Sequence, residues 1–309
     1  MKKKELYVLT GFLGAGKTSL LLHLLDHITD KKIGIIQNEF GKLSVDGERI
    51  QRGGITMTEI CRGSIFCSCL KLTFAQSLAE MGKMNLDVVF VESSGLADPS
   101  NMEEILTAVR VMAGDVYEFK GAVCLIDAVN FRQQVQSEET VRRQLLHCHM
   151  AVINKVDLIT PEELESLTSL IRSLNPRCKL VTCVNGQADL SFLNEDLLSL
   201  QWVEDEACSN SVDNKPKTFS MECSEPISRD VFHAFLEAVL PDCYRIKGVF
   251  LLEEGWYQVD VVEKLIDLQP CTEQDISHIV FLSKIGPKMI RVVDNAWREI
   301  VGKPMKLKN

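Results

Sequence analysis

The chain has 309 residues, of which 46% are apolar and 25% charged, the composition of a globular protein with a sizeable core. Its net charge of -9 argues against nonspecific nucleic-acid binding, which needs a basic surface, and no run approaches the roughly 18 apolar residues of a membrane helix. Its eleven cysteines are an odd number without an obvious pairing frame, so we expect reduced thiols and a cytoplasmic protein.

Short apolar, β-branched runs alternate with helical patterns over the first two-thirds of the chain. The expected strands are residues 6–10, 32–37, 87–92, 122–127, 151–154 and 179–184. The expected helices are residues 17–28, 141–146 and 161–174. The last of them has Thr160 as its N-cap, with Glu163 three residues on, as in a capping box. Because several strands are apolar throughout, the alternation predicts a doubly wound, mostly parallel α/β sheet whose two faces are covered.

The character of the sequence changes after Trp202. Residues 203–217 are polar, rich in Glu, Asp, Asn and Ser, and typical of a linker. Beyond them we expect strands at residues 219–223, 248–252, 256–261 and 279–282, and helices at 228–238 and 287–300. The sequence therefore predicts an α/β domain over residues 1–202, a linker over 203–217 and a small α+β domain over 218–309.

A complete phosphate-binding motif, G-x-x-x-x-G-K-T, lies at residues 11–18, between an expected strand and an expected helix. In such a loop, glycines let backbone N–H groups converge on phosphate oxygens, Lys17 reaches the β and γ phosphates, and the Thr18 hydroxyl binds Mg²⁺. A glycine-rich turn without a nucleotide is the alternative, which the full motif in this context disfavours. The candidate nucleotide-binding residues here are Gly11, Gly14, Ala15, Gly16, Lys17, Thr18 and Ser19.

A guanine-binding motif, N-K-x-D, lies at the end of a later apolar strand and comprises Asn154, Lys155 and Asp157. The Asp157 carboxylate can accept from both the ring N–H and the exocyclic amine of guanine. Adenine lacks that donor pair, and the mismatch would cost on the order of 1–3 kcal/mol. Alone, the tetrapeptide also fits a polar exit from a strand. Downstream of the phosphate-binding loop, it predicts GTP and GDP as ligands in preference to ATP.

Between these two motifs, an apolar strand ends at Glu92 and is followed by Ser, Ser and Gly95. An acidic residue at that place can hold Mg²⁺ through water, and the Gly95 N–H can meet the γ-phosphate. A surface acid at a strand end is the alternative interpretation of Glu92. Leu96 stands where many GTPases carry a water-orienting Gln, which predicts slow intrinsic turnover that a partner or a bound metal accelerates. The candidate catalytic residues are Lys17, Thr18 and Glu92, of which Thr18 and Glu92 serve Mg²⁺.

Together these motifs resemble the CobW-type GTPases, a branch of the SIMIBI class of P-loop proteins. The matching segments are residues 10–21 (TGFLGAGKTSLL), 37–41 (QNEFG), 92–99 (ESSGLADP), 126–128 (IDA), 154–158 (NKVDL) and 245–248 (RIKG). The resemblance spans nearly the whole chain. It implies a GTPase domain followed by a small C-terminal domain, and a role in delivering or inserting a metal ion or metallocofactor into a client protein.

One segment departs from the family's pattern. The family usually carries C-x-C-C after an Asn-Gly, with cysteines that bind Zn²⁺ or related ions, whereas here Gly63 is followed by SIFC. Three thiols, Cys61, Cys67 and Cys69, still lie within nine residues. They can fill three positions of a tetrahedral site for Zn²⁺, Co²⁺ or Cu⁺, with water or Glu39 as the fourth ligand. The alternative is three unrelated thiols that pack as small apolar side chains.

Two further groups of residues carry weaker signals. His147, Cys148 and His149 precede the strand of the guanine motif, and alternation along a strand would point both histidines to one face. Histidines at a strand entrance are more often exposed or hydrogen-bonded than bound to a metal. In RIKG, Arg245 and Lys247 are candidate contacts for a partner or a phosphate, but a solvated strand edge is the interpretation that we favour.

The leading hypothesis is a GTP-hydrolysing protein that uses Mg²⁺ and delivers Zn²⁺ or Co²⁺ to a client metalloprotein. The alternative is a metal-independent regulatory switch that acts on a client through the C-terminal domain, and the altered C-x-C-C favours it. A P-loop kinase is disfavoured by N-K-x-D and by the lack of an evident arginine-rich lid. We expect no nucleic-acid or membrane partner.

Overall fold

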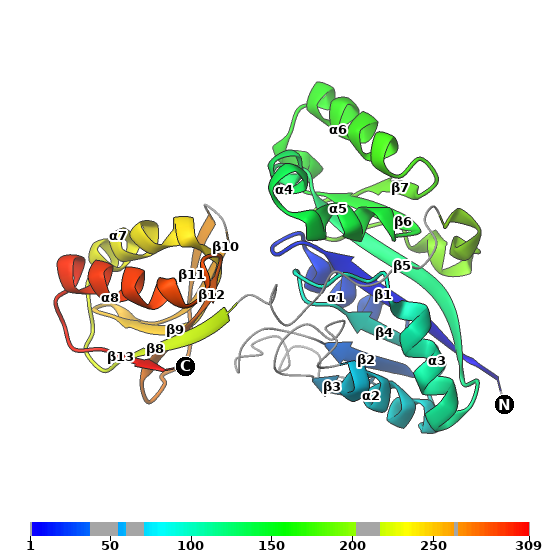
Figure 1. The fold of residues 1–309 in the computed structure, drawn as a ribbon, viewed down its shortest axis with the longest axis horizontal. Helices are drawn as coiled ribbons and strands as arrows, with labels where there is room; N and C mark the ends of the chain where they lie inside the picture. Colours follow the sequence, from blue (N-terminus) through cyan, green and yellow to red (C-terminus); the bar gives the residue numbers. More distant parts are fainter. Residues whose placement is uncertain (1, 38–54, 60–70, 202–216, 263–264, 309) are drawn as a thin grey trace. The chain divides into compact units, whose positions relative to one another are not determined.

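The computed structural model describes residues 2–37, 55–59, 71–201, 217–262 and 265–308. These residues form two compact units, a larger α/β unit that precedes the segment 202–216 and a smaller unit that follows it (Figure 1). The expected linker lies outside the described residues, apart from Lys217, which begins a strand of the smaller unit. No helix within the described ranges is both long and apolar enough to span a membrane.

The larger unit alternates strands and helices along the chain. Its strands are β1 (Lys4–Gly11), β2 (Ile33–Gln37), β3 (Ile55–Glu59), β4 (Val88–Glu92), β5 (Tyr117–Asp127), β6 (Met150–Asn154) and β7 (Lys179–Thr182). Its helices are α1 (Lys17–His27), α2 (Lys71–Lys83), α3 (Met102–Ala113), α4 (Phe131–Ser137), α5 (Glu139–Leu146) and α6 (Pro161–Leu174). Three 3-10 turns complete it: η1 (Val156–Leu158), η2 (Leu190–Asn194) and η3 (Leu197–Leu200). Neighbouring strands all pair in parallel, in the order β3-β2-β4-β1-β5-β6-β7, which confirms the predicted doubly wound sheet.

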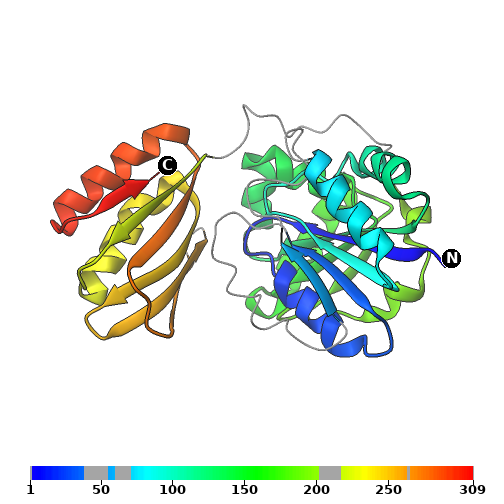
Figure 2. The same ribbon diagram turned by 90° about the horizontal axis from the view of Figure 1, so that it is seen from below.

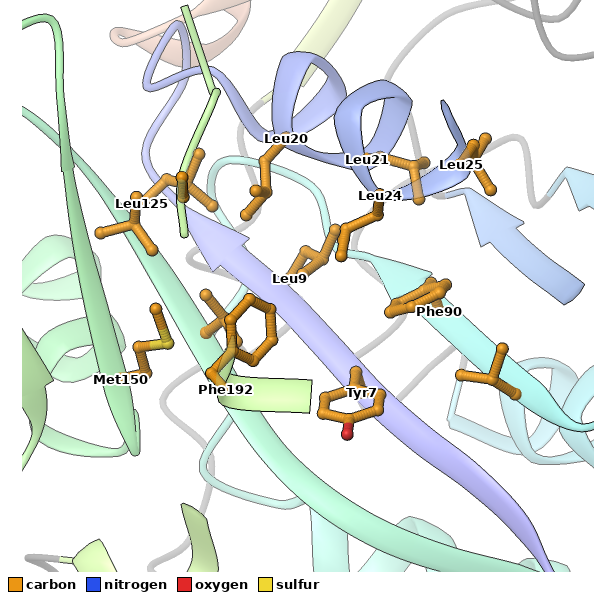
Figure 3. Packing of buried hydrophobic residues seen from close by; sticks show 14 of the residues in the cluster. Tyr7, Leu9, Leu20, Leu21, Leu24, Leu25, Phe90, Leu125, Met150 and Phe192 are labelled. Carbon is orange, nitrogen blue, oxygen red and sulfur yellow. The ribbon is translucent and has the colours of Figure 1, made fainter. Parts of the chain in front are cut away.

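Helices cover both faces of this sheet, which is why its central strands are apolar throughout. Figure 2 shows α1 on one side of the sheet and α2 and α3 on the other. Leu6 and Val8 of β1 pack toward α2 and α3, whereas Tyr7 and Leu9 pack toward α1. On the side that α1 covers, Tyr7 and Leu9 belong to a cluster of buried apolar side chains. Helix α1 contributes Leu20, Leu21, Leu24 and Leu25 to this cluster (Figure 3). Because the strands are parallel, the motifs at their carboxyl ends meet at one edge of the sheet.

Helix α6 begins with the capping box that the sequence predicts. The Thr160 hydroxyl accepts from the Glu163 N–H at 3.2 Å, and the Glu163 carboxylate accepts from the Thr160 N–H at 2.7 Å. Pro161 occupies the first helical turn, where its missing N–H costs nothing. Such a cap contributes about 0.5–2 kcal/mol, and it fixes the end of the loop that carries N-K-x-D.

The smaller unit has a six-stranded antiparallel sheet in the order β11-β10-β9-β12-β8-β13. Its strands are β8 (Lys217–Cys223), β9 (Cys243–Leu252), β10 (Gly255–Val262), β11 (Leu265–Pro270), β12 (Ser277–Ser283) and β13 (Lys306–Lys308). Its helices are α7 (Arg229–Val239) and α8 (Met289–Ile300), with the 3-10 turns η4 (Leu240–Asp242) and η5 (Gly286–Lys288). Both helices share one core with the strands, in which the Phe235 and Trp297 rings meet edge to face. The predicted small α+β unit is confirmed.

The RIKG residues lie in β9, and the expectation of a solvated strand edge is wrong. Strand β9 is paired on both sides, with β10 and β12. Arg245 forms a two-pronged ion pair with Asp260 of β10, with N–O distances of 2.9 and 2.7 Å, and Lys247 is only 7% exposed. A Cβ on Gly248 would lie 2.1 Å from the carbonyl oxygen of His278. The glycine of the motif therefore allows the close approach of β9 and β12.

Candidate functional site

The loop between β1 and α1 depends on glycines in left-handed conformations. Gly14 and Gly16 have φ angles of 74° and 100°, and Gly16 is the N-cap residue of α1. A Cβ on Gly16 would lie 2.2 Å from the side-chain nitrogen of Asn154, and one on Gly11 would lie 2.3 Å from the carbonyl oxygen of Leu125. The glycines thus let the loop pack against the ends of β5 and β6. No side chain caps the first turn of α1, the arrangement in which helix N-termini bind phosphate.

Lys17 lies inside this loop. Its side chain is 8% exposed, and its ammonium donates to the carbonyl oxygens of Gly11 at 2.8 Å and Phe12 at 3.0 Å. Phosphate oxygens would be stronger, charge-assisted acceptors for the same ammonium. The lysine is therefore held at the place where the motif predicts phosphate.

Thr18, in the first turn of α1, and Glu92, at the end of β4, come together in the site. The Thr18 hydroxyl donates to one Glu92 oxygen at 2.6 Å, and the Gln37 amide donates to the other at 3.0 Å. Strand β4 lies between β1 and β2, with Glu92 in register with Leu9 and Gln37, so the three strand ends meet. Because Glu92 is only 5% exposed, the alternative of a surface acid is wrong. A buried carboxylate beside a hydroxyl is an oxygen donor set that suits Mg²⁺.

The segment after the end of β4 contacts both the phosphate-binding loop and α5. A Cβ on Gly95 would lie 2.6 Å from the backbone nitrogen of Leu13, so a glycine is required for this approach. The Gln144 amide of α5 donates to the carbonyl oxygens of Gly95 at 3.1 Å and Ala97 at 2.9 Å. Gln144 thus holds the segment in place. The sequence motifs did not identify it, because its contacts form only when α5 packs behind the segment.

Asn154 joins two loops of the site. Its amide nitrogen donates to the Ala15 carbonyl at 3.0 Å, and its amide oxygen accepts from the Gly186 N–H at 3.1 Å. The side chain is 2% exposed. Gly186 has a φ of 74°, and a Cβ there would lie 2.6 Å from the backbone nitrogen of Leu20. The loop after β7 therefore belongs to the site, although sequence analysis missed it; the dipeptide Asn-Gly after an expected strand was the available signal.

Lys155 and Asp157 differ in their surroundings. Lys155 has a left-handed φ of 64°, and its ammonium lies 2.6 Å from a carboxylate oxygen of Asp127, which is 3% exposed. The same carboxylate accepts from the Val129 N–H at 2.9 Å. Asp157 lies in η1 and is exposed. Its carboxylate is thus accessible to a base that approaches the edge of the sheet.

The candidate cargo-metal residues Cys61, Cys67, Cys69 and Glu39 lie outside the described residues. In the part of the chain that the structure does describe, no group of three or more His, Cys, Asp or Glu side chains is arranged to hold a metal. The seven cysteines there are all free thiols. Of the widely spaced C-terminal cysteines, two pack in the core of the smaller unit and the third, Cys271, is half-buried.

The histidines before β6 do not form a metal site with Cys148. His147 follows α5 as its C-cap residue and β6 begins only at Met150, so strand alternation does not apply to them. His149 is 5% exposed, and its Nδ1 accepts from the Ala122 N–H at 3.0 Å. Burial is the main cause that lowers the pKa of His149 to about 4, and the nearby charge of His147 contributes to this shift. The neutral ring therefore carries its proton on Nε2, and a metal there would force that proton toward the Ala122 N–H. The hydrogen-bonded interpretation of His149 is confirmed.

The parallel sheet, the phosphate-binding loop and the buried Thr18–Glu92 pair define a P-loop nucleotide-binding protein. The chain belongs to the CobW/HypB/UreG family of nucleotide-binding domains, whose family model matches residues 5–182. The model of the cobalamin synthesis protein CobW C-terminal domain matches residues 217–291. The two matches fall on the larger and the smaller unit respectively.

Several known proteins are similar to this chain. It is 26% identical over 346 aligned positions to zinc-regulated GTPase metalloprotein activator 1 of Schizosaccharomyces pombe, which covers 94% of this chain and 82% of that protein. It is 31% identical over 191 positions to the zinc chaperone YjiA of Escherichia coli, which covers 60% of this chain and 59% of that protein. The crystal structure of Zn(II)-bound YjiA aligns with a TM-score of 0.48 at 23% identity, covering 97% of this chain and 99% of that one.

Proposed function

We propose that this chain binds and hydrolyses GTP in order to deliver a metal ion to a client metalloprotein. The observation that carries the proposal is the meeting of the P-loop, the buried Thr18–Glu92 pair and the N-K-x-D loop at one edge of a parallel sheet. Two relatives are named a zinc chaperone and a zinc-regulated metalloprotein activator, which supports Zn²⁺ as the cargo, with Co²⁺ as an alternative.

The nucleotide chemistry follows from the positions of the side chains. Lys17 and the N–H groups at the start of α1 would bind the phosphates, and Asp157 would select guanine. Thr18 and Glu92 would hold Mg²⁺, which would neutralise charge on the β and γ phosphates. Gly95 lies against the P-loop, which supports a contact of its N–H with the γ-phosphate.

Turnover is expected to be slow without a partner. Leu96 is 7% exposed and has no polar side-chain atom, so it cannot orient a hydrolytic water. Orientation of that water would then depend on a group supplied from outside the described site, by the client or by the cargo metal.

The cargo would be bound by Cys61, Cys67 and Cys69, with Glu39 or water as the fourth ligand. These residues are close in sequence to the nucleotide site. Glu39 is two residues from Gln37, which hydrogen-bonds Glu92, and Cys61 is two residues beyond the end of β3, which pairs with β2. Loss of the γ-phosphate on hydrolysis is therefore expected to alter the conformation of the segment that carries the three cysteines, because only a short stretch of chain separates that segment from the nucleotide site.

The second candidate function is a metal-independent switch that acts on a client through the smaller unit. It is favoured by one observation, the replacement of the family's C-x-C-C by SIFC.

The two functions are separated by measuring hydrolysis and zinc release on the full chain. Phosphate release is expected with GTP but not ATP, and Lys17→Ala should abolish it. A chromophoric chelator should take Zn²⁺ from the GDP-bound and the GTP-analogue-bound protein with affinities that differ at least about tenfold, a typical coupling between two sites. GTP hydrolysis with equal zinc affinities would overturn metal delivery and leave the metal-independent switch. Absence of GTP hydrolysis would overturn both.

A further inference from the structure

Residues 93–101 join the end of β4 to the start of α3 and are buried along their whole length. Within this segment, the Ala97 N–H donates to the Ser94 carbonyl oxygen at 3.0 Å, which closes a tight turn with Gly95 at its second position. Gly95 lies against the P-loop, since a Cβ on it would be 2.6 Å from the Leu13 backbone nitrogen. This turn, called the Gly95 turn below, therefore includes the residue whose N–H is proposed to contact the γ-phosphate.

Helix α5 donates two hydrogen bonds to the Gly95 turn. The Gln144 amide donates to the carbonyl oxygens of Gly95 at 3.1 Å and Ala97 at 2.9 Å, which belong to the second and the last residue of the turn. Gln144 is 1% exposed, so both bonds form away from water, where an unmade bond is costly. One side chain of α5 thus fixes two of the backbone carbonyls of the turn.

The preceding residue of α5, Arg143, holds the chain directly after the turn. Its Nε donates to one Asp98 carboxylate oxygen at 2.7 Å, and its Nη2 donates to the Ser100 hydroxyl at 3.1 Å. The other Asp98 oxygen accepts from the Ser100 N–H at 3.0 Å. The Asp98 side chain is 0% exposed and that of Arg143 is 13% exposed. Because a fully buried carboxylate needs a nearby cation, this ion pair determines where residues 98–100 can lie.

Close packing does not fix the segment on every side. Pro99 and Ser100 line a cavity of about 380 Å³ between α3, β5 and the turn that joins α5 to β6. Because the described side chains leave that space open, hydrogen bonds from α5 are needed to hold this part of the segment. The end of α5 is itself held, since the fully buried Asn175 donates to the carbonyl oxygens of Leu145 at 2.8 Å and Cys148 at 3.1 Å. Arg143 and Gln144 therefore project from a helix that is fixed in place.

We propose that Arg143 is a positioning residue for recognition of the γ-phosphate of GTP, and that it acts through Asp98 to hold the Gly95 turn against the P-loop. This role rests on the proposed function, in which the Gly95 N–H contacts the γ-phosphate. GTP has a γ-phosphate for the turn to contact, whereas GDP has none. Release of the turn from α5 should therefore weaken the binding of GTP and lower kcat, but leave the binding of GDP unchanged. A purely structural role of Arg143 would weaken the binding of both nucleotides alike.

The test compares the full wild-type chain with Arg143→Met/Asp98→Asn, Arg143→Lys and Arg142→Met. The double variant removes both charges together, so no unpaired charge stays buried, and the new amide oxygen can still accept from the Ser100 N–H. Arg143→Lys keeps a cation opposite Asp98 but lacks the second arm of the guanidinium that reaches Ser100. Arg142→Met is the matched control, because Arg142 is the neighbouring arginine on α5 but is exposed, where it pairs with Glu139 at 3.6 Å.

The measured quantities are kcat and the affinities for GDP and for a non-hydrolysable GTP analogue, all with Mg²⁺. In the double variant, kcat and the affinity for the analogue relative to that for GDP should each fall at least about tenfold, the contribution of one hydrogen bond to a charged group. Arg143→Lys should show a smaller loss in the same direction, and Arg142→Met should match the wild type. GDP binding by each variant reports that its fold is intact.

Wild-type values of kcat and of the affinity ratio in the double variant, or equal weakening of both nucleotides, would overturn the proposal. If the double variant does not bind GDP, Arg143→Lys decides in its place, and a wild-type affinity ratio in that variant would overturn the proposal. Failure of the wild-type chain to hydrolyse GTP would overturn the proposed function alone. The affinity ratio needs no hydrolysis, so it would still decide the role of Arg143.

Discussion

Replacing Asn154 by alanine is expected to destabilise the nucleotide-free chain. The side chain is 2% exposed, and it satisfies two backbone groups of the site, the Ala15 carbonyl at 3.0 Å and the Gly186 N–H at 3.1 Å. An unmade bond to a buried backbone group costs about 1–3 kcal/mol, so the two together should lower the free energy of unfolding by roughly 2–6 kcal/mol. Urea unfolding followed by circular dichroism measures this loss.

Asp157→Ala is the matched control, because Asp157 belongs to the same motif but is exposed. Its unfolding free energy should stay within about 0.5 kcal/mol of the wild type, as is usual for surface substitutions. Both variants should bind GDP more weakly. Inorganic triphosphate, which has no base, separates them: Asn154→Ala should bind it more weakly, since the P-loop loses its support at Ala15, whereas Asp157→Ala should bind it normally. Wild-type stability and wild-type triphosphate binding in Asn154→Ala would refute the conclusion that Asn154 supports the P-loop through its hydrogen bond to Ala15.

Three further substitutions test other parts of the account. Glu92→Gln keeps the shape of the side chain but removes the buried charge, so half-maximal GTP hydrolysis should need at least about tenfold more Mg²⁺. GDP binding in EDTA should be unchanged in this variant. An unchanged Mg²⁺ requirement would contradict a role of Glu92 in holding Mg²⁺. Gly186→Ala should cost about 1–3 kcal/mol more than Gly286→Ala in urea unfolding. Both glycines have positive φ angles, 74° and 65°, but only Gly186 has backbone within 3 Å of the added Cβ. Burial lowers the pKa of His149 to about 4. The His149 ring of the unfolded chain therefore binds a proton below about pH 6.5, whereas that of the folded chain binds one only below about pH 4. Stability should therefore fall by up to roughly 3 kcal/mol over that window, and less in His149→Asn; equal falls would argue against a neutral buried ring.

The sequence predicted the uninterrupted apolar strands closely, whereas it predicted strands interrupted by charged residues too short. Strand β5 begins at Tyr117, five residues before the expected start, because Glu118 and Lys120 break the apolar run. Strand β9 begins at Cys243 for the same reason, since Arg245 and Lys247 stand between apolar residues. Their charges are tolerated in strands because Lys120 and Glu118 pair with each other and Arg245 pairs across to β10. The pair between Arg245 and Asp260 joins two strands and cannot be recognised from the sequence of one strand alone.

Other elements were missed because their local patterns are weak. Strands β3, β11 and β13 are edge strands of their sheets. In β11 and β13, partial exposure removes the continuous apolar signal. Helices α3 and α4 have no side-chain cap that a capping motif would reveal, and tertiary packing supplies the stability of the apolar faces of α2 and α3.

The nucleotide-site residues that lie together in one short sequence motif were predictable. The P-loop glycines, Lys17 and Thr18 share a single loop, and Glu92 ends a recognisable strand. Arg143, Gln144 and Gly186 were not predictable, since each acts on a segment far away in the sequence. Arg143 and Gln144 hold residues 95–100, and the Gly186 N–H donates to the Asn154 amide oxygen. Their roles arise from the packing of α5 and of the loop after β7 against the ends of the strands.

In the proposed function, a GTP-dependent change alters the affinity of a cysteine-based metal site. An anaerobic Co²⁺ titration of the reduced chain, monitored by absorbance with Mg²⁺ and either a non-hydrolysable GTP analogue or GDP, tests it most directly. We expect thiolate-to-cobalt charge-transfer bands that are absent in Cys67→Ser, and a cobalt affinity that differs between the two nucleotides. Intact GTP hydrolysis without such bands, or bands with the same affinity in both nucleotide states, would contradict it.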